Sequence, residues 1–315
     1  MARSFLDDGQ EKAILCFLPL KEKRTMEAKK VLVAGATGYL GQYLVKELIK
    51  RNHEVRVLIR KESQKQLFVG VSDFFVGEIT QPETLIGICD NIDWVFTSIG
   101  ITRQKDGLGY MDVDYQGNLN LLNEARASSV SSFLYVSAIG GNELRHLKIF
   151  EAKEKFADSL KASGLNYTIM RPNGFFSDMK DFLEMAKQGT VYLFGHGNFK
   201  LNPIAGSDLA KVCVDSINSD EQEVIVGGPD ILTQNELAEL ALKAWKKDIK
   251  IMHLPDWIRK FIIWAVRAFT PAKTYGPIEF FMTLMGYDNI APQYGTERLE
   301  GFFNEEVKKM NRESH

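Results

Sequence analysis

The sequence predicts a doubly wound α/β fold, in which a parallel sheet carries helices on both faces and a smaller, mostly helical lobe follows. Three observations predict this fold. Short apolar runs alternate with stretches of helical spacing over residues 30–190, a glycine-rich turn follows the first run, and the alternation ends beyond Pro229. Strands that alternate with helices join through right-handed crossovers, so we expect the strands to run parallel.

The first strand is expected at Lys30 to Gly35, because this Val-rich run suits a strand buried on both faces. A helix from Tyr39 to Arg51 follows, with apolar side chains at helical spacing. Later runs predict strands at 54–59, 73–76, 93–98, 133–137, 167–170 and 223–226, and helices at 117–127, 150–162, 176–187, 234–246, 256–269 and 277–285. We therefore predict a loose N-terminal extension (1–28), a sheet domain (29–230) and a mostly helical lobe beside the sheet edge (231–315).

The composition narrows the class of protein. Lys and Arg total 39 against 41 Asp and Glu, and the formal charge of −2 excludes the broad positive field of a dedicated nucleic-acid binder. Three distant cysteines, at positions 16, 89 and 213, predict neither a disulfide framework nor a metal site and favour a reducing compartment. The apolar run at 13–20 is short and follows acidic residues, so it predicts neither a signal peptide nor a membrane span. We expect a cytoplasmic protein.

The glycine-rich turn Gly35-Ala-Thr-Gly38-Tyr-Leu-Gly41 lies between the first strand and the first helix. At that position Gly35 permits a tight turn, Gly38 lets a pyrophosphate approach the backbone, and Gly41 lets the helix pack against the strand. The free N–H groups and the positive dipole of the helix start would hold the phosphates. The turn therefore predicts a dinucleotide site, with a turn that holds no ligand as the alternative.

The end of the second strand bears on the choice of dinucleotide. An acidic residue there would bind the ribose 2′-hydroxyl of NAD(H), but this strand ends Leu58-Ile59-Arg60-Lys61. Arg60 can form forked hydrogen bonds to a 2′-phosphate, which favours NADP(H) over NAD(H). The alternative is that Arg60 and Lys61 are solvated surface charges.

Several segments resemble the short-chain dehydrogenase/reductase superfamily, whose domain is the NAD(P)-binding Rossmann fold. They are GATGYLG, DWVFTSIG, FLYVSAIGG, EAKEKFADSLKASGLNYTIMRPNGFFSDM and LNPIAGSDLA. The chain is most similar to the extended and atypical branch, which includes NmrA-like and isoflavone-reductase-like proteins, over about residues 30–230. The tail DNIAPQYGTERLEGFF resembles that of oxidoreductases described as epimerase/dehydratase-like.

The resemblance implies a role for each matching position. The implied cofactor contacts are the phosphate loop (Gly35, Thr37, Gly38, Tyr39, Leu40, Gly41), Glu78 on the adenine side, the loop Ser98, Ile99 and Gly100, the ribose-holding Lys153, and Arg171, Pro172 and Asn173 beside the nicotinamide ring. The implied catalytic residues are Lys153 and Ser137, the serine that orients a substrate carbonyl. Glu78 stands where the family usually has an aspartate, so its side chain is one methylene longer.

The family's usual acid, a tyrosine four residues before the lysine, is missing. That spacing would place both side chains on one helix face, where the ammonium lowers the phenol pKa. Counting back from Lys153 gives Ile149, which carries no proton to donate, and counting back from Lys155 gives Glu151. The standard carbonyl-reduction triad is therefore incomplete.

Three interpretations follow from the missing tyrosine. In the first, Lys153 or a group elsewhere serves as the acid while NADPH supplies the hydride. In the second, His146, Tyr110 or Tyr115 replaces the tyrosine. In the third, the protein binds NADPH without turning a substrate over. For Lys153 itself, the alternative is a surface lysine on a charged helix, and for Ser137 it is a turn-capping serine.

The later segments supply apolar and aromatic side chains that could cover a hydrophobic substrate or simply form core. These candidates are Phe175, Phe176, Met179, Trp257, Phe261, Trp264, Phe280, Phe281 and Tyr287. The apolar stripe of the helix at 256–269, bordered by Arg259, Lys260 and Arg267, is also typical of a helix that lies on a membrane surface.

The sequence thus predicts an NADPH-dependent oxidoreductase of the atypical short-chain type that acts on a small, hydrophobic molecule. Two alternatives stay open: a non-catalytic NADPH-binding redox sensor or accessory protein, and an epimerase or dehydratase that recycles its cofactor. The expected partner is a small-molecule substrate and not a nucleic acid, and the sequence leaves the oligomeric state open.

Overall fold

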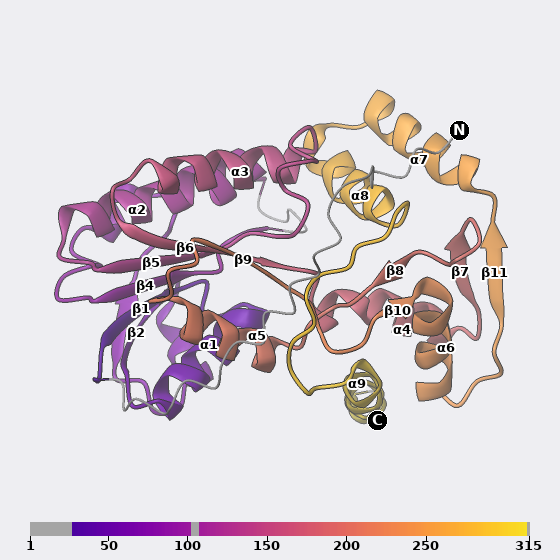
Figure 1. Cartoon of the computed structure of the whole chain (residues 1–315), viewed down its shortest axis with the longest axis horizontal. Coiled ribbons are helices and arrows are strands. Elements are labelled where there is room, and N and C mark those ends of the chain that lie inside the picture. The colour runs from indigo at the N-terminus through magenta and orange to yellow at the C-terminus, as the bar shows by residue number, and fades with distance from the viewer. Residues whose placement is uncertain (1–26, 102–106, 314–315) are drawn as a thin grey trace.

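The computed structural model describes residues 27–101 and 107–313. Their main feature is a seven-stranded sheet in the order β3-β2-β1-β4-β5-β6-β9, with every neighbouring pair parallel (Figure 1). The strands are β1 (Lys30–Ala34), β2 (Glu54–Ile59), β3 (Asp73–Val76), β4 (Trp94–Thr97), β5 (Ser132–Val136), β6 (Asn166–Pro172) and β9 (Glu223–Val226). The order reverses between β1 and β4, so this is the doubly wound Rossmann arrangement. The predicted fold class is confirmed.

Helices cover both faces of the sheet, as Figure 1 shows. Alternate residues of β1 explain why. Val31 and Val33 belong to one apolar cluster with α1 (Tyr39–Lys50) and α5 (Gly206–Ser216), whereas Leu32 and Ala34 belong to a second cluster with α2 (Asn118–Ala127) and α3 (Lys148–Lys161). Side chains alternate across a strand, so a continuous apolar run feeds two cores at once.

The connections after β2, β3 and β4 are short helical turns or a widened helix. They are the 3-10 helices η1 (Glu62–Leu67) and η2 (Pro82–Leu85) and the π-helix η3 (Met111–Gly117), which runs directly into α2. The sequence predicted only the part of this last segment from residue 117 onward. Because a π-helix closes its hydrogen bonds over five residues, the 3.6-residue spacing does not reveal it.

A second lobe has its own apolar cluster. It unites η4 (Phe176–Met179), α4 (Lys180–Lys187) and β7 (Val191–Phe194) with α6 (Gln234–Ala244) and α9 (Leu299–Glu313). Segment 176–194 therefore packs with the later helices, although the sequence-based division at residue 230 places it in the sheet domain. That division, and the extension at 1–28, stay predictions, and residues 1–26 lie outside the described part of the chain.

Two small sheets and two further helices complete the second lobe. β7 pairs in parallel with β11 (Ile251–Leu254), and β8 (Lys200–Leu201) pairs antiparallel with β10 (Leu232–Thr233). Helices α7 (Asp256–Phe269) and α8 (Ala272–Leu284) pack against each other, and α8 also contacts α3 (Figure 1). Within residues 27–101 and 107–313, no helix is long and apolar enough to cross a membrane.

Candidate cofactor-binding site

The glycine-rich turn adopts a shape that its residue types require. Gly35 has φ +82°, and a Cβ atom there would lie 2.9 Å from Ser98 Oγ. A Cβ atom on Gly41 would lie 2.2 Å from the Gly35 carbonyl oxygen, so the start of α1 can approach β1 only with glycine at this position. Both glycines therefore serve the close packing of strand, turn and helix.

The start of α1 fits an anionic ligand. Gly38 is its N-cap residue, no side chain caps the helix, and the first turn carries no acidic residue. The first N–H groups of an α-helix lack intrahelical partners and carry the positive end of the dipole. Phosphate oxygens would satisfy these donors, so the turn fits the pyrophosphate of a dinucleotide.

The side chains of Tyr39 and Leu40 make contacts inside the protein and do not point to the ligand site. Leu40 lies in the core, and Tyr39 Oη accepts a hydrogen bond from the Gly206 N–H at 3.1 Å. Burial raises the pKa of Tyr39 well above its usual range. Any contact of these two residues with a cofactor would therefore run through their backbone N–H groups, while Thr37 is half-buried beside them.

The loop after β4 lies directly beside the glycine turn. The Ser98 hydroxyl lies 3.5 Å from the Gly35 carbonyl oxygen, and Thr97 donates a buried hydrogen bond to Asn118 Oδ1 at 2.6 Å. The Asn118 amide in turn donates to the Ile99 carbonyl oxygen at 3.3 Å. The loop Ser98–Gly100 is thus anchored to α2 and held at the carboxyl edge of the sheet, where such folds bind ligands.

A buried ion pair lies next to that loop. Lys153 Nζ, on α3, is 2.9 Å from Asp114 Oδ1, on η3, and the Asp114 side chain is fully buried. A Cβ atom on Gly100 would lie 2.7 Å from both charged atoms. Glycine at position 100 therefore lets the backbone approach the Lys153 ammonium, and Lys153 is not a surface lysine.

Asp114 keeps Lys153 charged. Burial alone would lower the pKa of Lys153, but the carboxylate of Asp114 outweighs burial and raises the pKa above its usual range. An ammonium of raised pKa is a poor proton donor near neutral pH. The Lys153 ammonium is thus suited to electrostatic and hydrogen-bond contacts rather than to proton donation. The residue pattern gave no sign of this role for Asp114.

The neighbouring Glu154 organises a second buried network. Arg171 holds it with two hydrogen bonds, at 2.6 and 2.9 Å, and also pairs with Glu223 at 2.7 Å. Ser137 lies at the end of β5 as predicted, but its hydroxyl donates to Glu154 Oε1 at 3.2 Å. The Arg171 guanidinium is therefore engaged inside the protein, which leaves the implied cofactor role of this segment to its backbone.

Asn173 connects the end of β6 to the chain's last third. Its amide donates to Asn202 Oδ1 at 2.6 Å and to the Asn289 carbonyl oxygen at 2.5 Å. The carbonyl oxygen of the buried Pro172 accepts a hydrogen bond from the Ile139 N–H at 3.1 Å. Both residues thus brace the carboxyl edge of the sheet.

Arg60, Lys61 and Glu78 follow β2 and β3, the two strands beside β1. The backbone N–H groups of Arg60 and Lys61 both donate to Gln64 Oε1, at 2.8 and 3.1 Å, and both side chains are exposed. Glu78 is half-buried, and its N–H donates to Thr84 Oγ1 at 2.9 Å. Because these strands are parallel neighbours, the three residues share one sheet edge with Gly35.

The structure separates the candidate replacements for the missing tyrosine. His146 is exposed and precedes α3, which begins at Lys148, so it does not share a helix face with Lys153. Tyr115 is half-buried, with Lys155 Nζ 4.3 Å from its ring centroid. The Tyr110 hydroxyl is buried, has no hydrogen-bond partner among the described residues, and has a pKa that burial raises to about 12.

The apolar and aromatic candidates differ in burial: Phe176 and Met179 lie in the core of the second lobe, whereas others lie on α7 and α8. Phe280 of α8 packs edge-on against Phe150 at 5.3 Å between ring centroids, in the cluster that contains Tyr110 and Ile149. Helix α8 thus covers the start of α3 beside Lys153. In contrast, Trp257, Phe261 and Trp264 are exposed on α7, so they do not form core in this chain.

Comparison with known proteins decides the family. The family described as NAD(P)H-binding matches residues 35–220. The chain belongs to this family. The match spans the glycine turn, the loop after β4 and both members of the Lys153–Asp114 pair, and it agrees with the resemblance to atypical short-chain reductases.

The similar proteins are distant. The chain is 26% identical to the chloroplastic divinyl chlorophyllide a 8-vinyl-reductase of Zea mays, over 89% of this chain and 79% of that protein. It is 30% identical to the photosystem II assembly factor Ycf39 of Cyanophora paradoxa, over 47% of this chain and 46% of that protein. An NADPH complex of an Escherichia coli NADPH-dependent quinone oxidoreductase shares the fold, with a TM-score of 0.65, 16% identity, and coverage of 89% and 99%.

Proposed function

We propose that this protein is an NADPH-dependent reductase of a hydrophobic acceptor that carries a conjugated carbon–carbon double bond. One observation carries the proposal: the buried Lys153–Asp114 pair lies against Gly100, on the sheet edge that also holds the open N-terminus of α1. Bound NADPH would supply the hydride. Lys153 would hold a hydroxyl of the cofactor, and the glycine turn would hold its phosphates.

The type of acceptor follows from the proton donors that the site offers. Carbonyl reduction ends with a proton on oxygen, and Ile149 stands where the family's phenol would donate it. Lys153 stays charged because of Asp114, so it does not replace the phenol. After the hydride has added, a conjugated alkene spreads the negative charge over its own π system and takes its proton at carbon from water. The name of the maize relative, a vinyl reductase, supports this class of acceptor.

A specific observation also favours a non-catalytic alternative. The tyrosine position is filled by the buried Ile149, and one relative is named an assembly factor rather than an enzyme. In this alternative the protein binds NADPH without reducing a substrate, and a partner protein recognises the NADPH-bound form. The epimerase or dehydratase alternative has only fold-level support, from solved epimerases that are 20% identical or less.

Turnover separates these functions. We expect the purified protein to bind NADPH and to oxidise it when divinyl chlorophyllide a or another conjugated vinyl compound is added, with slower oxidation by quinones and none by simple aldehydes. Loss of NADPH absorbance and mass analysis of the reduced product measure this. Tight NADPH binding without turnover of any acceptor would contradict the reductase and favour the accessory protein.

The Gly38→Asp variant tests whether turnover depends on a cofactor bound at the glycine turn. An aspartate at the N-cap satisfies the first N–H groups of α1 and stabilises the helix, so the variant should fold. Its carboxylate occupies the donors that the phosphates need and repels them. The variant should lose NADPH binding and turnover together while keeping the wild-type circular dichroism.

Arg60 and Lys61 are proposed to select NADPH over NADH. Changing both to alanine should raise the Kd for NADPH by about tenfold or more, because a charge-assisted pair to the 2′-phosphate is lost. The Kd for NADH should stay within about twofold, since NADH has no 2′-phosphate. Lys65→Ala, on the neighbouring η1, is the control, because Lys65 pairs with Glu62. Equal affinities of the wild-type protein for NADPH and NADH would remove this assignment.

We further propose a reducing, cytoplasmic location. Cys89 and Cys213, the cysteines within the described residues, are both free and buried, and burial raises their thiol pKa values. A chain kept in an oxidising compartment would more often pair its cysteines. Cys16 lies outside the described residues. The word chloroplastic in the name of the maize relative describes that protein and not this chain.

A further inference from the structure

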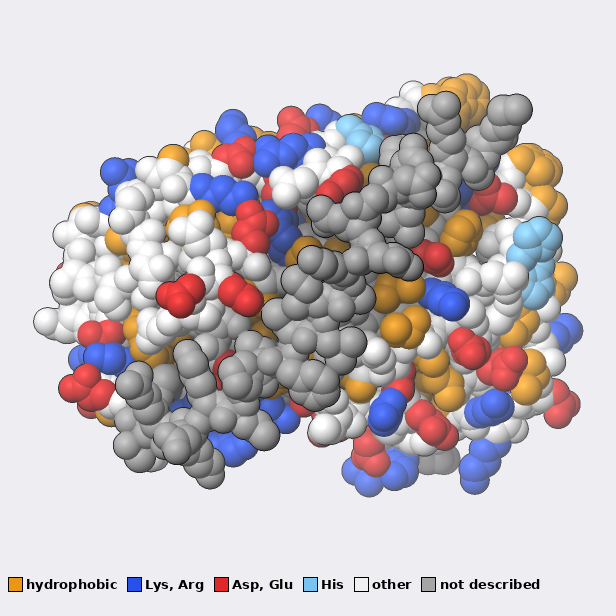
Figure 2. Space-filling model, viewed as in Figure 1, with side chains coloured by type: hydrophobic (Ala, Val, Ile, Leu, Met, Phe, Trp, Pro, Cys, Tyr) orange, Lys and Arg blue, Asp and Glu red, His pale blue; other side chains and the backbone are white. Residues whose placement is uncertain are grey.

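Helix α7 exposes a stripe of large aromatic side chains. Trp257, Phe261 and Trp264 are 64%, 54% and 59% exposed, and their spacing of four and three residues places them on one face of the helix. In Figure 2, hydrophobic side chains are visible at the upper right of the molecule, where Figure 1 places α7. Scattered exposed hydrophobic residues are ordinary, but an aligned aromatic stripe on one helix marks an interaction surface.

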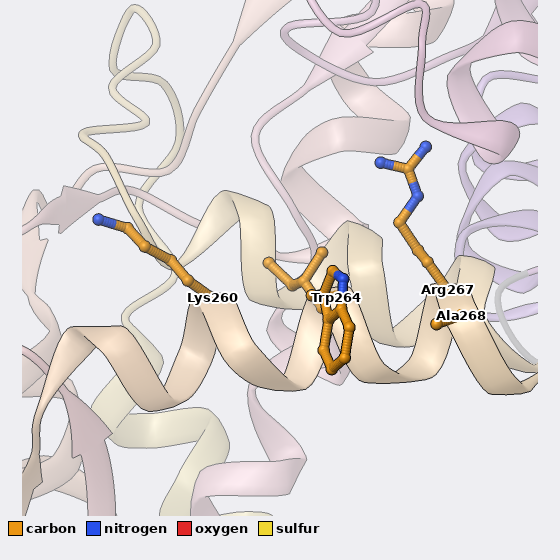
Figure 3. A pocket seen from close by; sticks show the side chains of 5 residues that line it. Lys260, Trp264, Arg267 and Ala268 are labelled. Carbon is orange, nitrogen blue, oxygen red and sulfur yellow. The ribbon is translucent and has the colours of Figure 1, made fainter.

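Cationic side chains border the stripe. Lys260 and Arg267 extend from α7 on either side of Trp264 (Figure 3), and together with Ile263 and Ala268 these residues line a shallow surface hollow of about 550 Å³. The side chains of Lys260 and Arg267 are 71% and 52% exposed. Their positions are seven residues apart, which is two turns of the same helix.

The local charge is positive although the whole chain carries −2. Helices α7 and α8 hold four cationic residues and two acidic ones. Glu279, which pairs with Arg267 at 3.3 Å, is buried beneath it, and Asp256 pairs with both Arg259 and Lys260 near the start of α7. An approaching surface therefore meets the exposed Arg267 before the buried Glu279, while the partly exposed Asp256 lies nearer the start of α7 and offsets part of the charge of Arg259 and Lys260.

We propose that this face of α7 binds the surface of an anionic lipid bilayer. Trp and Phe side chains enter the boundary between headgroups and acyl chains, while Lys260 and Arg267 contact lipid phosphates. The helix has 14 residues, too few to cross the hydrocarbon core, so it lies in the plane of the surface. The proposal does not depend on the reductase activity.

Charge argues against a second copy of this chain as the occupant. Symmetric dimers use the same patch on both subunits, so two α7 faces would bring Lys260 and Arg267 of one subunit towards those of the other. Like charges at such an interface oppose association. An anionic bilayer supplies both missing features, an apolar layer for the aromatic stripe and negative charge for its border.

Vesicle binding tests the proposal. We expect the full chain to co-sediment with vesicles of phosphatidylcholine and phosphatidylglycerol, and much less with phosphatidylcholine alone. Phe261→Ser with Trp264→Ser should lower the partition coefficient by about tenfold or more, because the apolar contact is lost. Lys260→Gln with Arg267→Gln should remove the preference for the anionic vesicles while keeping weak binding to both kinds.

Matched controls guard against unfolding and against a dimer. Val69→Ser with Ile86→Ser removes two exposed apolar side chains from the sheet domain and should leave vesicle binding unchanged. NADPH affinity and circular dichroism at the wild-type level are required of every variant, as evidence that its fold is intact. Absence of wild-type binding to anionic vesicles would overturn the proposal. A dimer that the Phe261/Trp264 variant dissociates would instead assign the face to a second copy.

Discussion

The Lys153 ammonium stays charged in a buried position because the Asp114 carboxylate lies 2.9 Å from it. Each group offsets the desolvation of the other, so removing one partner exposes the full cost of the remaining charge. Lys153 was predicted from its position in the chain. Asp114 was not, because the two acids of the segment, Asp112 and Asp114, look alike in the sequence and only the fold decides which one is buried.

Lys153→Met should therefore lower both stability and cofactor affinity. We expect about 3 kcal/mol less free energy of unfolding, because Asp114 is left buried and unpaired, together with weaker NADPH binding. Adding Asp114→Asn should recover most of the stability without recovering the affinity. Denaturant titration and NADPH titration measure the two effects.

Lys148→Met is the control on the same helix, because Lys148 pairs only with the exposed Glu151, and it should change the free energy of unfolding by less than about 0.5 kcal/mol. Wild-type NADPH affinity in the Lys153→Met variant would exclude Lys153 from the cofactor site.

At the scale of elements, local patterns located most strands and helices but missed some of their ends. Helix α3 begins at Lys148 and its N-cap residue, Leu147, forms no side-chain cap. The sequence therefore contains no capping residue that marks where this helix begins. Helix α8 begins at Ala272 and continues through Pro277, although a proline usually marks a helix start. Packing of α8 against α3 and α7 overrides that local preference.

At the scale of the molecule, Asp208 joins the two lobes. It lies in the first turn of α5, on the sheet, and accepts hydrogen bonds from Lys211 at 2.8 Å and from the backbone N–H groups of Thr296 and Glu297, both at 2.9 Å, just before α9. Burial alone would raise the pKa of Asp208, but these donors outweigh burial and lower it. The carboxylate thus holds the C-terminal segment against the sheet domain.

The depressed pKa of Asp208 fixes the sign of a pH effect. Its stabilising contribution is fully present above the unfolded pKa of about 3.9 and is lost as the pH falls through the lower folded value. Asp208→Asn should lower the free energy of unfolding by about 1–3 kcal/mol at neutral pH, and the difference from the wild type should shrink below about pH 4. Denaturant unfolding at a series of pH values measures this.

Asp215→Asn provides the control on the same helix. Asp215 pairs with Arg51 but is largely exposed, so its replacement should cost less than about 0.5 kcal/mol at any pH. A pH-independent difference between Asp208→Asn and the wild type would show that the carboxylate charge is not what holds the segment.

The residue pattern alone was enough to predict the Rossmann sheet, the glycine turn and the NAD(P)H-binding class, because buried strands and tight glycine turns are local requirements that residue types express directly. Three features emerged only from the packed chain: Asp114 faces Lys153, Glu154 and Arg171 pair with each other, and segment 176–194 joins the second lobe. Local spacing shows that a helix or strand has a buried face, but not which residues of other elements cover that face. Partners such as Asp208 and Thr296, 88 residues apart, meet only when the whole chain has packed.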